Sequence, residues 1–205
     1  MKLLELAKRE IDSIVQMYIL HDKHEIIISL LPPLAKLNNH DHEACQFGTS
    51  FENDFTFYIN NEGIRVNKDI IYDIGGCVPH SAYSPHKFTI TTLDIKYFCQ
   101  GNPASGQEGI KTEELVSCAV APGIYRQTYE NNVFVYDTYT YEDLCSMEFS
   151  GGDYDYIIAS TPGVCAMEDS VLELEEMRIY EPHRNKNYIL AGKVPDTRFV
   201  CIRFK

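Results

Sequence analysis

Several histidines and a cysteine lie close enough along the chain to suggest a reactive site. His80 and His86 follow Cys77, a grouping that could bind a metal ion or form a Cys–His nucleophile. No acidic or cysteine partner stands at a recognised ligand spacing from them, and sequence proximity alone does not define a catalytic dyad. His40 and His42 lie in a polar stretch, where we expect them to be solvated. The sequence therefore predicts no metal cofactor.

A phosphate-binding loop is a second type of site to consider, because residues 101–109 are rich in glycine. Such a loop needs a Lys-Ser or Lys-Thr ending, and it connects a strand to a helix. This segment has neither the ending nor the flanking elements. We therefore expect residues 101–109 to form a mobile loop beside a binding cleft.

The composition predicts a folded intracellular protein, cytoplasmic or nuclear. With 205 residues, 44% of them hydrophobic, the chain can bury the core of a single domain spanning residues 1–205. Charges interrupt every apolar run near the N-terminus, and no apolar stretch is long enough to cross a bilayer. The seven cysteines are an odd number without a CxxC pair, so they predict reduced thiols and no disulfide framework.

The net charge of −12 limits the classes of partner. A strongly acidic surface repels phosphate groups, which argues against general binding to nucleic acids or to anionic membranes. Any nucleotide ligand must therefore be held by a local site.

Apolar periodicity predicts helices in the first part of the chain. Apolar residues recur at three- and four-residue steps over residues 3–20, which is typical of an amphipathic helix. Residues 51–62 form a second predicted helix, which Gly63 could end in a left-handed cap. Branched and aromatic residues then predict short strands at 64–66, 88–92, 115–120, 133–136, 156–159, 177–180, 188–194 and 198–204.

This layout predicts an α+β fold, with a helical portion over residues 1–40 and a mainly β core over residues 41–205. The strands follow the helices without regular alternation, which argues against a doubly wound sheet. The sequence shows no internal repeat.

Four stretches, taken in order, resemble the core of a known family: residues 42–64, 81–99, 114–125 and 154–190. The last is the most specific, with Tyr-Asp-Tyr-Ile at 154–157, Glu-Glu-Met-Arg-Ile-Tyr at 175–180 and Tyr-Ile-Leu at 188–190. On these motifs the chain resembles the catalytic domain of the poly(ADP-ribose) polymerase superfamily. The resemblance implies a split, antiparallel-rich β-sheet core of ADP-ribosyltransferase type.

The resemblance also implies an activity, that of an NAD-dependent ADP-ribosyltransferase. Such an enzyme cleaves the nicotinamide–ribose bond of NAD and transfers single ADP-ribose units to a macromolecular acceptor, here a protein. Glu176 matches the family's catalytic glutamate, which would stabilise oxocarbenium charge on the ribose. The alternative for Glu176 is an exposed carboxylate on an edge strand, and Glu175 would take the role if the strand register slipped by one residue.

The same resemblance implies a set of residues that bind NAD. Gly48 would offer its backbone to the nicotinamide carboxamide, and Tyr97 would stack on the nicotinamide ring. The alternatives are an ordinary turn glycine and a core tyrosine. The positions that match the family's NAD pocket are Phe47, Gly48, Thr49, Tyr83, Asp94 and Tyr97.

Three of these positions depart from the family pattern. Phe47 stands where the family has a histidine that hydrogen-bonds the ribose, which a phenyl ring cannot do. Asp94 stands where the family usually has a serine. Either Tyr83 or Phe88 occupies the position of the family's middle tyrosine. Because such losses are expected of an inactive relative, the alternative function is a pseudoenzyme that serves as a protein-interaction or scaffold module.

Overall fold

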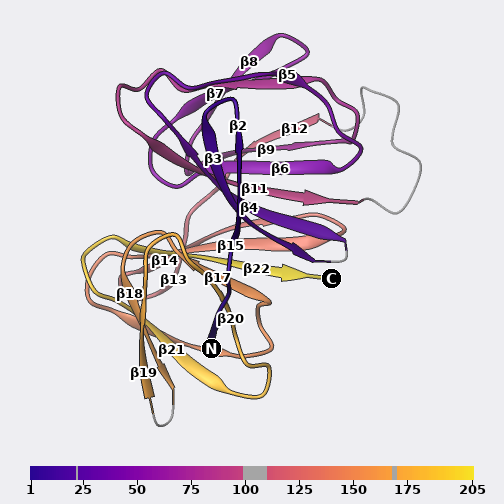
Figure 1. The fold of residues 1–205 in the computed structure, drawn as a ribbon. Coiled ribbons are helices and arrows are strands. Elements are labelled where there is room, and N and C mark those ends of the chain that lie inside the picture. The colour runs from indigo at the N-terminus through magenta and orange to yellow at the C-terminus, as the bar shows by residue number, and fades with distance from the viewer. Residues whose placement is uncertain (22, 99–109, 168–169) are drawn as a thin grey trace. The chain divides into compact units, whose positions relative to one another are not determined.

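The structure, a computed structural model, describes residues 1–21, 23–98, 110–167 and 170–205, and every regular element in these ranges is a β-strand (Figure 1). Segment 101–109, expected to form a loop beside a cleft, lies outside the described residues. The chain divides into two compact units: Leu6–Leu115, here the N-terminal unit, and Met1–Glu5 together with Val116–Lys205, here the C-terminal unit. The part of the chain that is described contains no helix long and apolar enough to cross a membrane.

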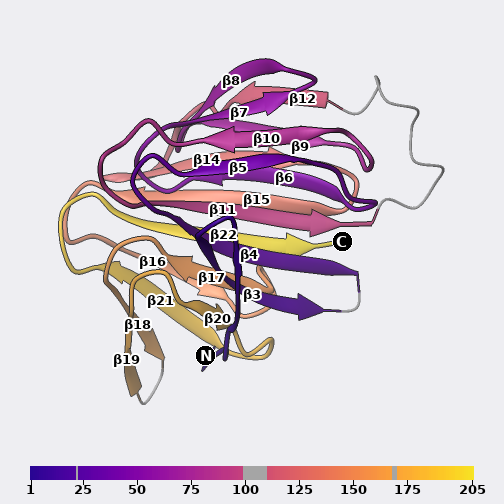
Figure 2. The ribbon, with the colours of Figure 1, turned by 45° about the horizontal axis from the view of Figure 1, so that its top comes forward.

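The N-terminal unit contains two antiparallel sheets. The seven-stranded sheet has the order β12-β9-β6-β11-β4-β3-β2, and the four-stranded sheet has the order β5-β10-β7-β8 (Figures 1 and 2). Buried side chains such as Phe55, Val66 and Ile74 form one apolar core cluster of this unit. The strands are β2 Ala7–Ile11, β3 Ile14–His21, β4 His24–Leu31, β5 Lys36–His40, β6 Cys45–Ser50, β7 Phe55–Ile59, β8 Glu62–Val66, β9 Ile70–Ile74, β10 His80–Tyr83, β11 Ile90–Tyr97 and β12 Ile110–Glu114.

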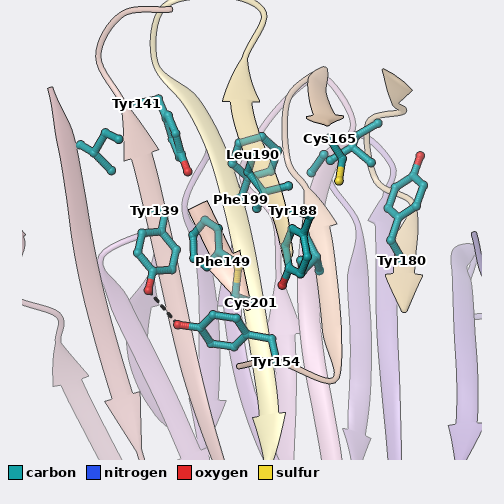
Figure 3. Packing of buried hydrophobic residues seen from close by; sticks show 14 residues of the cluster. Tyr139, Tyr141, Phe149, Tyr154, Cys165, Tyr180, Tyr188, Leu190, Phe199 and Cys201 are labelled. Atoms are coloured by element: carbon teal, nitrogen blue, oxygen red, sulfur yellow. Dashed lines mark hydrogen bonds between the residues drawn. The ribbon is translucent and has the colours of Figure 1, made fainter. Parts of the chain in front are cut away.

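The C-terminal unit also contains one seven-stranded and one four-stranded sheet. The orders are β1-β20-β17-β22-β15-β14-β13 and β16-β21-β18-β19. Its core is rich in aromatic rings, including Tyr139, Phe149 and Phe199 (Figure 3). The strands are β1 Lys2–Leu3, β13 Cys118–Ala121, β14 Ile124–Glu130, β15 Phe134–Tyr141, β16 Ser146–Ser150, β17 Tyr156–Ala159, β18 Gly163–Met167, β19 Ser170–Leu174, β20 Ile179–Glu181, β21 Asn187–Gly192 and β22 Thr197–Phe204.

The two units have the same strand topology. Strands β2 to β11 of the N-terminal unit correspond in order to β13 to β22 of the C-terminal unit. The remaining edge position beside β9 is filled by β12, and the matching position beside β20 is filled by β1. The sequence shows no internal repeat, but the two units have the same strand order. Backbone hydrogen bonds define how strands pair, so two units with different side chains can have the same strand order.

Both predicted helices are β-hairpins in the structure. Residues 3–20 contain β2 and β3, which are joined at Asp12 and Ser13 with φ of 51° and 67°. Residues 51–62 contain β7 and the first residue of β8, joined at Asn60 and Asn61 with φ of 50° and 68°. Two consecutive residues with positive φ make a two-residue turn whose twist matches the strands it joins, and a helix cannot continue through them. Gly63 therefore lies inside β8 and caps no helix.

The predicted α+β fold is wrong, as is the helical portion over residues 1–40, which contains β1 to β5. Apolar residues at three- and four-residue steps suggested a helix because several strands are apolar on both faces. In β3, which lies within the predicted helix, Ile14 is buried and the apolar residues Val15, Met17, Tyr18 and Ile19 are half-buried. A strand buried on both faces has a continuous apolar run, and such a run contains helical spacings as well.

Candidate metal centre

Three histidines of the N-terminal unit meet where two neighbouring strands pair. His40 is the last residue of β5, His80 is the first residue of β10, and the antiparallel register places them opposite each other. His42 follows two residues after His40. Their ring centroids are 4.3 Å apart for His40 and His80, and 5.0 Å apart for His42 and His80. One ring nitrogen from each histidine lies within 4.8 Å of the other two, a grouping that can hold a metal ion.

Each of these rings uses Nδ1 to contact a backbone carbonyl. A carbonyl oxygen only accepts hydrogen bonds, so each Nδ1 carries the proton and each Nε2 carries a lone pair. In metal sites the second ring nitrogen is usually held in this way, which fixes the orientation of the ligand. The contacts are His40 to the oxygen of Asn38 (2.9 Å), His42 to that of Ala44 (2.8 Å) and His80 to that of Val78 (2.8 Å).

The Nε2 atom of His80 has an environment that fits a ligand position. It is buried and has no hydrogen-bond partner among the described residues. Burial lowers the pKa of His80 to about 4, and burial also lowers the pKa of His42, with the nearby Lys96 charge as the next cause. Both rings are therefore neutral at neutral pH, and neutral imidazole is the form that binds metal ions.

Gln46 adds a fourth donor atom. Its Oε1 lies 2.7 Å from His42 Nε2. Its Nε2 donates to the hydroxyl of Tyr72 at 2.8 Å and to Oδ1 of Asp94 at 2.9 Å, which fixes the orientation of the amide. Because His42 donates from Nδ1, its Nε2 lone pair faces the lone pairs of the amide oxygen. A cation bound by both atoms would remove this repulsion.

A buried network holds Gln46 from behind. The Tyr72 hydroxyl donates to Asp94 Oδ1 at 2.6 Å, and the Tyr72 ring stacks on Phe57 with centroids 3.7 Å apart. Burial raises the pKa of Asp94, and burial followed by the Asp94 charge raises the pKa of Tyr72. Gly48 provides the room for this ring, because a Cβ atom on Gly48 would lie 2.1 Å from the nearest atom of Tyr72. The missing side chain at Gly48 of β6 therefore lets the Tyr72 ring lie where its hydroxyl supports the Gln46 amide.

A cavity of ≈ 370 Å³ lies beside the histidines, within the N-terminal unit. Polar side chains from the seven-stranded sheet line one part of it, among them Ser29, Thr92 and Lys96. Apolar side chains line another part: Ile14, Ile27, Leu31, Leu37, Phe55 and Phe57. A concave site that combines apolar side chains with polar groups is able to bind and orient a small molecule.

The predicted absence of a metal site is therefore wrong for these histidines. Sequence proximity paired His80 with His86, whereas the structure joins His80 to His40 and His42 and leaves His86 bonded to the carbonyl oxygen of Asp54 at 2.8 Å. The signal available in the sequence was the His-x-His spacing, since residues two apart in an extended segment point to the same side. The third ligand is brought in by the pairing of β10 with β5, which the sequence does not show locally.

Most residues assigned to the NAD pocket lie in the N-terminal unit. Phe47, Gly48 and the buried Thr49 are in β6, and Asp94 and Tyr97 are in the neighbouring strand β11. The structure brings Gly48 and Asp94 together as register partners, with Asp94 bonded to Gln46.

The other assigned residues lie apart from this group. Tyr83 ends β10 and is exposed, as is Phe88. Glu176 is exposed in the turn between β19 and β20 of the C-terminal unit. The neighbouring Glu175 is also exposed and forms an ion pair with Arg178 at 3.4 Å. The N-terminal unit thus contains none of the residues proposed for cleavage of NAD.

Comparison with known proteins shows the class of fold. No protein-family model matches the sequence, and no curated protein matches it either. Solved structures do match, and they are cupin-type β-barrels. AerE from Microcystis aeruginosa has a TM-score of 0.76 and 14% identity, over 98% of this chain and 97% of that one. The cupin 2 conserved barrel domain protein from Leptotrichia buccalis has a TM-score of 0.64 and 10% identity, over 100% of this chain and 98% of that one.

A further similar structure is oxalate decarboxylase from Bacillus subtilis, a protein with Mn(II) centres. It has a TM-score of 0.69 and 8% identity, over 99% of this chain and 76% of that one. At these identities the comparisons establish a cupin-type fold and nothing finer.

These findings correct the family and the function inferred from the sequence. The chain does not have a poly(ADP-ribose) polymerase fold, so neither an NAD-dependent ADP-ribosyltransferase nor an inactive relative of one is supported. The NAD-binding roles of these residues were inferred only from the resemblance to that family, so nothing now supports them. The short apolar motifs that carried the resemblance occur in β-strands of many folds, because they report strand character more than topology.

Proposed function

We propose that the N-terminal unit binds a divalent first-row transition-metal ion through His40, His42, His80 and Gln46, and that the protein is a metal-dependent enzyme for a small molecule bound in the adjoining cavity. One observation carries this proposal. Each of the three histidines directs its Nδ1 proton to a backbone carbonyl, which leaves its Nε2 free to bind a metal ion, and one ring nitrogen of each lies within 4.8 Å of the other two. Without a cation the buried Nε2 lone pair of His80 would be left without a partner among the described residues.

The donor set favours certain metals. Imidazole nitrogens suit iron, nickel, copper and zinc, and the amide oxygen also suits manganese. All four donors are neutral, so a bound divalent ion would keep its full charge. Such an ion would act as a Lewis acid toward an oxygen atom of the substrate.

The chain's own residues prepare the site. The backbone carbonyls of Asn38, Ala44 and Val78 orient the imidazoles, while Asp94 and Tyr72 fix the amide of Gln46. The apolar part of the cavity would exclude water around a bound molecule, which strengthens electrostatic interactions there.

Metal titration of the whole protein tests the proposal. After treatment with a chelator and its removal, isothermal titration with Mn²⁺, Co²⁺ and Ni²⁺ should show one high-affinity site per chain, with affinity rising in that order. His80→Ala should weaken binding by at least ~100-fold, since it removes a ligand and not only a supporting contact. His86→Ala is the matched control, because His86 lies in the same unit and bonds to a backbone carbonyl. Equal affinities for the His80→Ala variant and the wild type would overturn the proposal.

A further inference from the structure

Lys96 occupies a distinctive place in the cavity. It lies on β11 directly opposite Gln46 of β6 on one side and Glu25 of β4 on the other. Residues opposite each other on neighbouring strands project to the same face of a sheet. Lys96 therefore shares its face with the candidate metal ligand Gln46, and it lines the same cavity.

The Lys96 ammonium has no close partner in the part of the chain that the structure describes: no hydrogen bond joins it to a described residue, and no carboxylate oxygen lies within ion-pair distance. The two carboxylates nearest in its electrostatic environment, Asp94 and Glu25, are engaged elsewhere. Glu25 accepts from Arg9 at 2.7 Å, and Asp94 accepts from Tyr72 and Gln46. A half-buried ammonium usually has a hydrogen-bonded partner, so this one points to a ligand that the cavity would supply.

The charge balance of the site favours an anion as that ligand. Four charged side chains line the cavity, Lys96, Asp94, Asp12 and Asp41; of these, Lys96 and Asp94 are the ones that are not exposed, and the four candidate metal ligands are neutral. Asp12 and Asp41 are exposed and therefore screened by solvent. A divalent ion bound by neutral ligands would leave an uncompensated positive charge next to a second cation. An anionic group placed between them would satisfy both.

The remainder of the cavity suits an apolar group. Phe55, Leu37 and Ile14 line it, and they belong to the apolar core cluster or pack against it. The cavity volume of ≈ 370 Å³ is near the lower end of the range for small-molecule pockets, about 300–1,000 Å³. A compact ligand with one charged end and an apolar body would match these two kinds of lining.

We infer that the cavity binds a small monocarboxylic acid with an apolar body, whose carboxylate contacts the Lys96 ammonium beside the metal centre. This inference rests on the proposed function, which it extends to a class of substrate. Lys96 is the residue that would distinguish an acid from the corresponding neutral amide, because an ammonium gains a charge-assisted hydrogen bond only with the acid.

The test uses Co²⁺-loaded full-length protein with 3-phenylpropionate and 3-phenylpropionamide as probes, measured by isothermal titration. The wild type should bind the acid at least ~10-fold more tightly than the amide, a difference typical of one charge-assisted hydrogen bond. Lys96→Met should abolish this preference while Co²⁺ is still bound at one site per chain and at least as tightly as in the wild type, and Lys96→Arg should retain most of the preference. Lys36→Met, at an exposed site on β5, is the control and should behave as the wild type.

The outcomes separate the two proposals. Equal binding of acid and amide by the wild type, absence of binding of either, or an unchanged acid preference in Lys96→Met would overturn the inference about the substrate. In each of those cases normal uptake of Co²⁺ would leave the proposed metal site standing. Failure of the wild type to take up Co²⁺ would instead overturn the proposed function itself.

Discussion

The two units have the same strand order, but different side chains lie between corresponding strands. In the N-terminal unit, β5 and β10 bring His40 and His80 together beside a cavity. In the C-terminal unit the corresponding strands, β16 and β21, pair Phe149 with Tyr188, and these rings stack with centroids 5.9 Å apart (Figure 3). Aromatic rings thus pack between the pair of strands that in the other unit carries two of the histidines. A cavity of ≈ 320 Å³ also lies in the C-terminal unit, beside Phe149 and Tyr154, so the two units differ in the side chains that these strands carry and not in having a cavity.

A buried carboxylate in each unit shows the same contrast. Asp94 holds Gln46 in the candidate metal centre, as described above. Asp137 of the C-terminal unit is 1% exposed and accepts from Arg126, Thr128 and Tyr154 at 2.9, 2.6 and 2.6 Å. Tyr154 also bonds to Tyr139 at 2.7 Å (Figure 3). All three of these partners of Asp137 belong to its own unit, and we expect the carboxylate to stabilise that unit.

The largest expected effect comes from removing that carboxylate. Asp137→Ala would remove the acceptor of the buried Tyr154 hydroxyl and that of the exposed Thr128 hydroxyl, and would break the ion pair with Arg126. We expect a loss of about 3 kcal/mol in the free energy of unfolding, the low end for a broken buried pair because Arg126 is partly exposed. Chemical denaturation measures this loss. The affinity for Co²⁺ should not change, and a variant that lost metal binding would contradict the separation of roles between the units.

A pair of glycine substitutions gives the next largest effect. A Cβ atom on Gly48 would lie 2.1 Å from the Tyr72 ring, and one on Gly163 of the C-terminal unit would lie 2.5 Å from the Phe199 ring. Each alanine variant should lose about 1–3 kcal/mol of stability through overpacking. Only Gly48→Ala should also weaken Co²⁺ binding, because Tyr72 supports Gln46. Equal metal affinities in the two variants would show that Tyr72 does not position the amide.

The charge of Asp94 is expected to act on the metal ion through Gln46. Asp94→Asn should lower Co²⁺ affinity by about 10-fold, as loss of a supporting hydrogen-bond partner of a ligand commonly does. Asp73→Asn is the matched control, since Asp73 is also buried and accepts from a tyrosine, Tyr97, at 2.5 Å. Titration of both variants decides the point, and an unchanged affinity in Asp94→Asn would mean that the carboxylate has no influence on the centre.

The smallest expected effect tests the aromatic core of the C-terminal unit. The hydroxyl of Tyr188 is buried without a hydrogen-bond partner among the described residues, and burial raises its pKa. Tyr188→Phe should therefore change stability by less than ~0.5 kcal/mol, whereas Tyr154→Phe should lose about 1–2 kcal/mol with its two hydrogen bonds. Thermal unfolding of both variants makes the comparison. A large loss in Tyr188→Phe would reveal a partner for that hydroxyl.

Local sequence patterns predicted part of the β structure. Strand β17 covers Tyr156–Ala159, the range expected from its branched and aromatic residues, and β22 at Thr197–Phe204 differs from the expected range by one residue. The hairpins at Asp12–Ser13 and Asn60–Asn61 were not predicted, because the apolar residues of their strands also recur at helical steps. The turn residues are the signal that distinguishes a hairpin from a helix here. The turn residues at 194–197 also predict a hairpin between the last two strands, but β21 and β22 lie in different sheets.

The candidate site could be predicted only in part, because its parts are distant in the sequence. The spacing of His40 and His42 is a local signal for two ligands on one side of an extended segment. His80 joins them only through the β5–β10 pairing, and Asp94 reaches Gln46 only through the β6–β11 pairing. Such non-local pairings depend on the whole topology, which a single sequence does not specify locally.

Pulsed EPR of the Mn²⁺-loaded protein tests the central claim most directly, because it counts the imidazole nitrogens bound to the ion. One ion per chain with three coupled imidazole nitrogens is the predicted result, falling to two in His80→Ala and remaining at three in His86→Ala. A bound ion without imidazole coupling, or one whose coupling is unchanged in His80→Ala, would contradict the account.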